Sequence, residues 1–169
     1  MNPLRYKFLG VLPYSYNHQG NVVFLLGQER FESGFPDSLL WSGFGGRPEP
    51  EDSNIYQGAS REAWEESMGF LGSQEELYHK LVQSDEMYTE GSEGITFPLR
   101  IPFDNNIHYL YKNVYNYIRK GYPIDLAPKG FYEKINIDWF SPIDITTQKD
   151  IIRPAFYKFF TNLVVPSIK

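Results

Sequence analysis

The stretch Arg61-Glu-Ala-Trp-Glu-Glu contains three glutamates whose spacing predicts one acidic site. Glu62, Glu65 and Glu66 stand at positions i, i+3 and i+4, so on a helix their carboxylates share one face. Like charges placed in this way destabilise a helix unless something compensates, and only Arg61 is near in sequence. A hard divalent cation is the simplest compensation, because Mg²⁺ and Mn²⁺ take carboxylate oxygens and keep places for water and phosphate. The triplet therefore predicts a Mg²⁺ or Mn²⁺ site.

Signals at both ends of this stretch predict the helix that carries the triplet. Residues 48–52 read Pro-Glu-Pro-Glu-Asp, which is incompatible with regular helix. Ser53 or Asn54 is suited to the N-cap, because a short polar side chain accepts from the free N–H groups of the first turn. Gly69 is suited to the stop. The alternative is an acidic face exposed to solvent, but such a face normally interleaves Lys or Arg at these offsets.

The wider segment 46–70 resembles the Nudix box, G-x5-E-x7-R-E-U-x-E-E-x-G-U, in which U is apolar. Gly46 opens the segment and the Arg-Glu-x-x-Glu-Glu core is intact. Asp52 stands where the family has Glu, the spacer before Arg61 has eight residues instead of seven, and two residues instead of one precede Gly69. The run Leu-Leu-Gly-Gln-Glu and a later Trp-x-x-Phe-Gly-Gly resemble the lead-in to this box, so the resemblance covers roughly residues 7–70.

The resemblance implies a hydrolase that cleaves the diphosphate linkage of a nucleoside diphosphate joined to another group. It implies that Glu65 and Glu66 bind the divalent cation directly and that Glu62 lies beside them. Arg61 is implied to hold an acidic partner, most simply Asp52, without touching substrate. The implied metal ligands are Gly46 (through its carbonyl), Glu62, Glu65 and Glu66.

A general base outside the box is the least determined part of this site. Family members often use a glutamate in a late loop or near a strand that precedes a tryptophan, and Glu133 and Asp138 occupy the matching region. Glu90 and Glu93, in an acidic glycine-bearing loop, are rivals, and some members use a glutamate of the box itself. We favour Glu133. The three histidines form no metal-binding motif and stay outside the predicted site.

The substrate stays open at this point. Free nucleotides, dinucleoside polyphosphates, ADP-ribose and capped RNA all contain a suitable linkage. An alternative of another class is a catalytically silent Nudix fold that binds a nucleotide or a protein, and the two altered spacings favour it. The intact Arg-Glu-x-x-Glu-Glu core argues against it. An RNA-cap hydrolase is a further alternative, and it would need a basic track for RNA.

The order of elements predicts one α/β domain over residues 1–169, with a mixed sheet between helices. The resemblance implies the α/β/α sandwich of the Nudix fold. Alternating or apolar runs predict the strands and helical spacing predicts the helices. The predicted strands are 6–14, 22–28, 39–43, 95–102 and 131–140, with an antiparallel hairpin at the start. The predicted helices are 54–69, 74–83, 107–120 and 150–164, and the predicted loops are 29–38 and 84–94.

Composition narrows the class of protein. The chain has no cysteine, which excludes disulfides and thiolate metal sites. No apolar run approaches the roughly 20 residues of a membrane span, so we expect a cytoplasmic protein with no membrane partner. Residues 1–100 carry 7 basic and 15 acidic side chains (a balance of −8) and residues 101–169 carry 9 and 6 (+3). A strongly basic face for a long nucleic acid is not evident, and basic residues of the second part could reach a phosphorylated substrate. The resemblance implies a small nucleotide diphosphate derivative as the partner, and an RNA cap stays possible.

Overall fold

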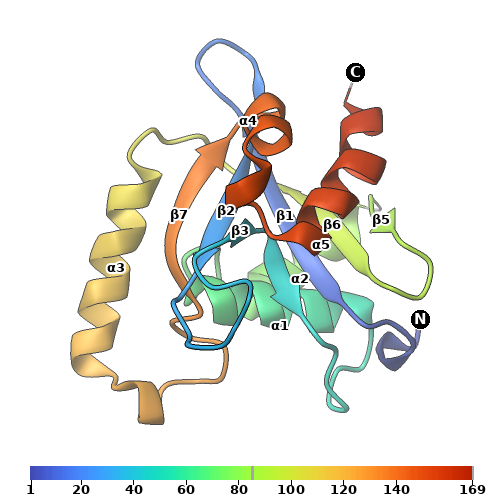
Figure 1. Ribbon diagram of the computed structural model, residues 1–169. Helices are drawn as coiled ribbons and strands as arrows, with labels where there is room; N and C mark the ends of the chain where they lie inside the picture. The colour runs from blue at the N-terminus through green and yellow to red at the C-terminus, as the bar shows by residue number, and fades with distance from the viewer. Residues whose placement is uncertain (85, 169) are drawn as a thin grey trace.

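The computed structural model describes residues 1–84 and 86–168, and its sheet is organised around β1. β1 pairs with β6 in parallel along one edge and with β2 and β4 antiparallel along the other. β2 is also antiparallel to β3 and β7, and β5 is antiparallel to β6. The sheet is therefore mixed, as the sequence predicts (Figure 1). The strands are β1 (Leu9–Tyr16), β2 (Val22–Glu29), β3 (Trp41–Ser42), β4 (Phe44–Gly46), β5 (Tyr88–Thr89), β6 (Ile95–Arg100) and β7 (Lys134–Phe140).

β1 and β2 form a hairpin whose strands pair with each other only near the turn. Further from the turn the two strands separate, and each pairs with a short strand of the segment 41–46. The two strands pair directly only from Tyr14 to Tyr16, opposite Val22 to Phe24. Further along, β3 pairs with β2 and β4 pairs with β1. The β1–β4 approach needs glycine on both strands, because a methyl group at Gly45 would stand 2.5 Å from the Gly10 Cα. This close pairing places Gly45 and Gly46 beside Gly10 and Leu9, at the start of β1.

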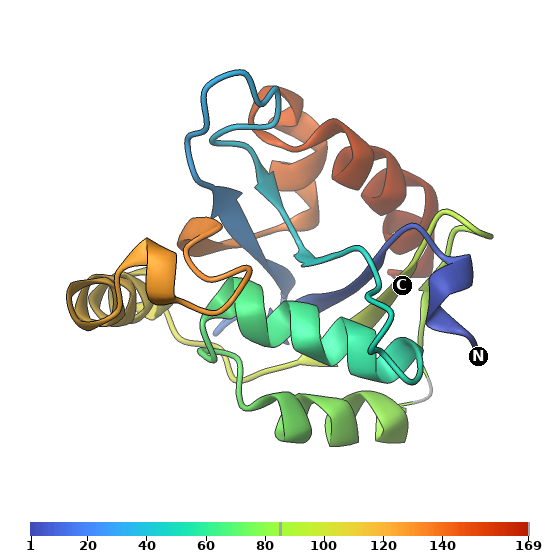
Figure 2. The same cartoon turned by 90° about the horizontal axis from the view of Figure 1, so that it is seen from below.

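Helices cover both faces of the sheet and bury two apolar cores. Alternate residues of one strand point to opposite faces, so Leu9 and Val11 enter the core under α1 and α2, while Leu12 enters the core under α4 and α5. Figure 2 shows these layers, with α3 at the flank beside β7. The predicted α/β/α sandwich is confirmed. The helices are α1 (Ile55–Ser67), α2 (Gln74–Ser84), α3 (Ile107–Gly121), α4 (Pro142–Thr147) and α5 (Pro154–Phe159).

The predicted helices and strands exist, but several bounds were wrong. The predicted helix 150–164 begins only at Pro154, because the residue before a proline, here Arg153, disfavours the helical conformation. Ile152 forms a β-bridge with Trp41 instead. A π-helical turn, Phe160–Val164, continues α5. The predicted strand 131–140 begins at Lys134. The helix α4 was not predicted. Of the predicted loop 84–94, Asp85 lies outside the described residues. Within the described chain, every helix is too short or too polar to cross a bilayer.

The end of α1 explains one of the altered spacings. The helix is regular to Ser67, and its C-cap is Met68, which adopts the left-handed conformation at φ 53°. Gly69 follows with φ 75°. The predicted stop at Gly69 is therefore one residue late: the additional residue lies beyond the helix, and the spacing of the glutamates within α1 is unaffected.

Candidate active site

The start of α1 is held against the preceding loop by a side-chain cap and a glycine. The Asn54 side chain accepts hydrogen bonds from the N–H groups of Tyr56 and Gln57, so Asn54 is the N-cap. Gly58 lies one turn into the helix, where a methyl group would stand 2.9 Å from Asp52 Oδ2. The missing side chain lets the loop carboxylate of Asp52 pack directly against the helix.

Arg61 connects that loop to the glutamates. Its guanidinium donates to both oxygens of Asp52, at 3.0 Å each, which is the bidentate arrangement. Its Nη1 donates to Glu62 Oε1 at 2.9 Å and to Glu65 Oε2 at 3.0 Å. Burial raises the pKa of Asp52, but the hydrogen bonds from Arg61 and from the Glu49 N–H, with the Arg61 charge, bring it below the usual range. The expected Arg61–Asp52 contact is therefore present.

Glu62 lies against the glycine that opens the box. A methyl group at Gly46 would stand 2.5 Å from Glu62 Oε2, so this carboxylate occupies the space that any side chain there would fill. Burial raises the pKa of Glu62 to about 7, with Glu65 and Glu133 acting in the same direction and Arg61 against them. Glu62 therefore has an environment that disfavours its charge in the absence of a further cation.

Glu66 is the most buried of the three glutamates, with 3% of its surface exposed. Its Oε2 accepts the N–H of Gly45 at 2.8 Å and lies 3.8 Å from Lys134 Nζ. Burial raises the pKa of Glu66 to about 8, although Lys134 opposes the shift. The pKa of Glu65 is also raised, chiefly by burial.

Lys134 and Glu29 form a buried ion pair close to the α1 glutamates. The sequence analysis did not predict this pair. Lys134 is fully buried, and its Nζ donates to Glu29 Oε1 at 2.5 Å and to Ser42 Oγ at 2.9 Å. Arg153 adds a second cation, with Nη1 3.4 Å from Glu29 Oε1. Gly27 makes room for the lysine stem, since a methyl group there would stand 2.8 Å from Lys134 Cδ.

Glu133 is the predicted base candidate that lies with the α1 glutamates. It lines the same acidic cavity as Glu62, Glu65 and Glu66, and burial, with the charge of Glu29, raises its pKa. Asp138 is exposed on β7 and lies outside this cavity.

The other carboxylates of the acidic loops 48–52 and 84–94 are engaged or lie apart from these glutamates. Glu90 and Glu93 line a different cavity. Glu49 lies beside the acidic cavity but is paired with Lys129, and its Oε2 is 3.8 Å from Arg61 Nε, while Glu51 is exposed. Glu133 therefore remains the candidate base that the structure brings to the α1 glutamates, and its role stays a prediction.

The acidic cavity has a volume of about 410 Å³. Its lining includes Gly130, which sequence reasoning did not select, although Pro128-Lys-Gly is typical of a turn. Gly130 has φ 82°, and a methyl group there would stand 2.7 Å from Glu65 Cβ. The ionisable lining residues are Glu29, Arg30, Glu32, Arg47, Glu62, Glu65, Glu66, Lys129, Glu133 and Arg153.

The donor set of this cavity suits a hard divalent cation. It offers carboxylate oxygens without sulfur or imidazole, which is the chemistry that Mg²⁺ and Mn²⁺ select. The raised pKa values of Glu62 and Glu66 point the same way, because a bound cation would favour their charged forms. Among the described residues, no three His, Asp or Glu side chains are already grouped to hold an ion. An ion must therefore compete with Arg61 for Glu62 and Glu65.

Solved structures resemble this arrangement of sheet and helices. An Ap4A hydrolase from C. elegans matches with a TM-score of 0.50 at 20% identity, over 92% of this chain and 93% of that chain. The fold is that of the Nudix hydrolases. The MutT protein of Methanosarcina mazei Go1 matches with a TM-score of 0.49 at 19% identity, over 95% of this chain and 96% of that one. RenU, a Nudix hydrolase from M. smegmatis, matches at 0.49 and 13% identity, over 98% and 88%.

No protein-family model and no curated protein matches the sequence. The Nudix fold therefore rests on the three-dimensional comparison, while the site rests on the contacts of this chain. The segment 46–70, which resembles the Nudix box, forms β4's last residue, the loop and α1 of the structure.

Proposed function

We propose that this protein is a divalent-metal-dependent hydrolase that cleaves the diphosphate linkage of a nucleoside diphosphate derivative. The observation that carries the proposal is the convergence of Glu62, Glu65, Glu66 and Glu133 on one acidic cavity beside Gly46. Carboxylates gathered in this way suit metal-assisted attack of water on a phosphoanhydride, for which the protein supplies positioning and electrostatics. Ap4A, named for the C. elegans neighbour, contains linkages of this class.

The metal site would be made by Glu65 and Glu66, with Glu62 and the Gly46 carbonyl beside them. Mg²⁺ or Mn²⁺ bound there would screen the phosphate charge and lower the pKa of a coordinated water. Arg61 would act as a positioning residue, because its bonds to Asp52 and to the helix glutamates fix α1 against the loop. The basic residues of the cavity rim, Lys129 among them, would attract the anionic substrate.

Glu133 would act as the general base. Its raised pKa places it nearer neutral pH than an ordinary carboxylate, which suits proton transfer from water. In this scheme Glu133 accepts the proton as the water oxygen bonds to phosphorus. The bond from phosphorus to the bridging oxygen then breaks, and the leaving phosphate takes the electron pair.

The test is hydrolysis of a panel of nucleoside diphosphate derivatives, dinucleoside polyphosphates and capped RNA with Mg²⁺ or Mn²⁺, with wild type beside Glu65→Gln. We expect wild type to cleave at least one member and Glu65→Gln to lose about 100-fold or more of that activity while staying folded. Glu75→Gln, on the exposed face of α2, is the matched control and should keep full activity.

One observation supports a second candidate, a silent Nudix fold that binds a nucleotide without cleaving it. Arg61 already engages Glu62 and Glu65, and the described residues contain no ready-made cluster of ligands. Nucleotide binding without cleavage of any panel member, with either metal, would establish this candidate and exclude the hydrolase.

A further inference from the structure

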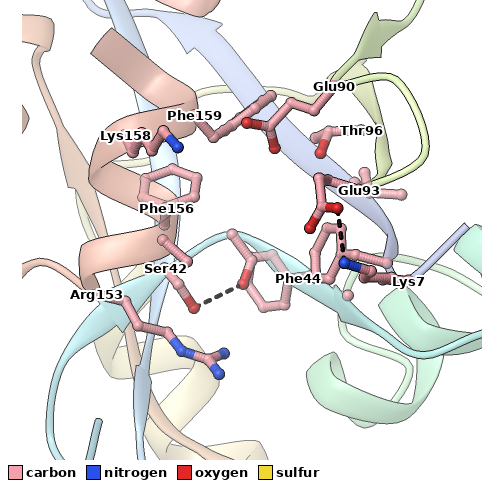
Figure 3. Close-up of a pocket in the computed structure, with 15 residues that line it drawn as sticks. Lys7, Ser42, Phe44, Glu90, Glu93, Thr96, Arg153, Phe156, Lys158 and Phe159 are labelled. Carbon is pink, nitrogen blue, oxygen red and sulfur yellow. Dashed lines mark hydrogen bonds and ion pairs between the residues drawn. The ribbon is translucent and has the colours of Figure 1, made fainter. Parts of the chain in front are cut away.

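A second cavity lies on the other side of β4 from the acidic one. Its volume is about 350 Å³, within the rough range of 300–1,000 Å³ for small-molecule sites. Phe44 and Phe159 are buried in its walls, and Phe156, which is only partly buried, also lines it (Figure 3). Gly45 and Arg153 line both cavities, so the two sites meet along β4. A ligand long enough to occupy both cavities would pass along this shared wall.

The walls of this aromatic cavity suit a flat ring with hydrogen-bond donors. Phe156 is only partly buried and can stack on a planar base, while Phe44 and Phe159 form the apolar wall behind it. Such stacking stabilises a bound base without selecting among the bases. Selection then depends on polar groups that face the cavity. Figure 3 shows Glu90 and Thr96 on one side, opposite Phe156 and Phe159. Glu93 also lines the cavity, but its Oε1 accepts from Lys7 Nζ at 2.7 Å.

Glu90 is the carboxylate that remains available to a ligand. Within the described chain its side chain accepts no hydrogen bond and forms no ion pair, while its backbone is fixed by the tight turn before β6, where its N–H donates to Gly94 O at 3.0 Å. Burial raises the pKa of Glu90, and the charge of Lys158 opposes that shift. A carboxylate that lines an aromatic cavity and has no partner among the described residues offers a ligand two acceptor oxygens and no donor.

We propose that the aromatic cavity binds a guanine base and that Glu90 selects it. Guanine presents two adjacent donors, N1–H and the 2-amino group, which match both oxygens of one carboxylate. Adenine and cytosine present a donor next to an acceptor, and that acceptor would face an unpaired carboxylate oxygen. Uracil presents one donor between two carbonyls. A site that satisfies a donor pair rejects bases without it, because its own polar groups are left unpaired.

This inference rests on the proposed function for its phosphate end, and it narrows the substrate to guanosine diphosphate derivatives. The first measurement is kcat/KM for matched pairs that differ only in the base, Gp4G against Ap4A and GDP-glucose against ADP-glucose. We expect the guanine member to be preferred by about 10- to 100-fold, the discrimination of one bidentate pair. Equal rates for both bases in wild type would overturn the inference and leave the proposed hydrolase intact.

Glu90→Gln is the decisive variant, because glutamine offers one acceptor and one donor. A glutamine complements adenine better than guanine. We therefore expect kcat/KM to fall for the guanine substrates and to rise for the adenine substrates, so that the preference disappears or reverses. A variant that was merely damaged would lower both rates. Glu93→Gln, in the same loop, should keep the guanine preference. A loss of preference in Glu93→Gln with none in Glu90→Gln would overturn the assignment of Glu90.

Binding of GDP and ADP, measured by calorimetry on wild type and Glu90→Gln, separates this inference from the proposed function. One outcome is that no panel member is hydrolysed, while wild type binds GDP about tenfold or more tightly than ADP and Glu90→Gln shows no such difference. The guanine site is then supported and the proposed hydrolase is wrong. If GDP and ADP bind equally, the guanine site fails whatever the hydrolysis result. Thermal unfolding of both variants confirms that each comparison is between folded proteins.

Discussion

At Gly46 the absence of a side chain decides where the Glu62 carboxylate lies. A methyl group there would stand 2.5 Å from Glu62 Oε2, inside the contact distance of any real side chain. We therefore expect Gly46→Ala to displace Glu62 and to lower kcat by about 100-fold, the effect of roughly 1 Å of misplacement in a site. Hydrolysis kinetics beside circular dichroism would measure it. Gly121→Ala, whose methyl group meets open space, is the control, and equal activity of the two variants would contradict the prediction.

Asp52 and Arg61 give a prediction about stability and pH. The Asp52 side chain is 2% exposed and shares both oxygens with the guanidinium. We expect Asp52→Asn to lower the free energy of unfolding by about 2 kcal/mol at pH 7. Since the folded pKa of Asp52 is lowered, its contribution is complete above the ordinary value of 3.8 and is lost as pH falls through the folded value.

Urea denaturation of wild type and Asp52→Asn at pH 7 and pH 3 would measure this linkage. The difference between the two proteins should be largest at pH 7 and smaller at pH 3. Glu51→Gln, an exposed carboxylate of the same loop, is the control and should match wild type at both pH values. A difference that grows as pH falls would show that Asp52 does not act through its charge.

At the scale of elements, the register of β7 on β2 creates the buried Lys134–Glu29 pair. The register shifts between Gln28 and Glu29, so that Glu29 stands opposite Lys134 while Gln28 stands opposite Asn136. Lys134→Met keeps the length of the stem but leaves Glu29 buried without its main partner. We expect it to destabilise the fold by about 3 kcal/mol. The double variant Lys134→Met/Glu29→Gln removes both charges and should recover most of that loss.

A double-mutant cycle in urea would test this pair, with wild type, both single variants and the double variant. Recovery in the double variant indicates that the penalty comes from the unpaired charge. If the double variant is as unstable as the sum of the single ones, the two side chains act independently and the inferred pairing is wrong.

Helices and strands that follow from the local spacing of apolar residues could be predicted from the sequence. Contacts between residues far apart in the sequence could not. The apolar spacing of 107–120 predicted α3 within one residue, and the triplet in α1 predicted the shared face. Lys134 reads as an ordinary surface residue in the sequence, and its partner Glu29 lies 105 residues away. Their contact depends on the shift in register between β2 and β7, where Ile135 is passed over, and no local pattern encodes this shift. Glu133 was found only because the resemblance directed attention to the segment before the late tryptophan.

At the scale of the whole molecule, charge separates a small-nucleotide enzyme from an RNA-cap hydrolase. The chain has a net charge of −5, and the cations of the acidic cavity are few: Arg30, Arg47, Lys129 and Arg153. From this net charge we expect a long RNA to gain little from phosphate contacts outside the cavity. We expect KM for a dinucleoside polyphosphate and for a capped RNA oligonucleotide to show similar, shallow salt dependence, with a log–log slope of about 1 to 2. Kinetics between low and high salt would measure both slopes.

The contrary outcome is a capped RNA that binds more tightly than the small nucleotide and shows a clearly steeper slope. Each further phosphate contact adds about 0.7 to the slope for a single strand. A steeper slope would therefore show a phosphate track beyond the cavity and would favour the cap hydrolase.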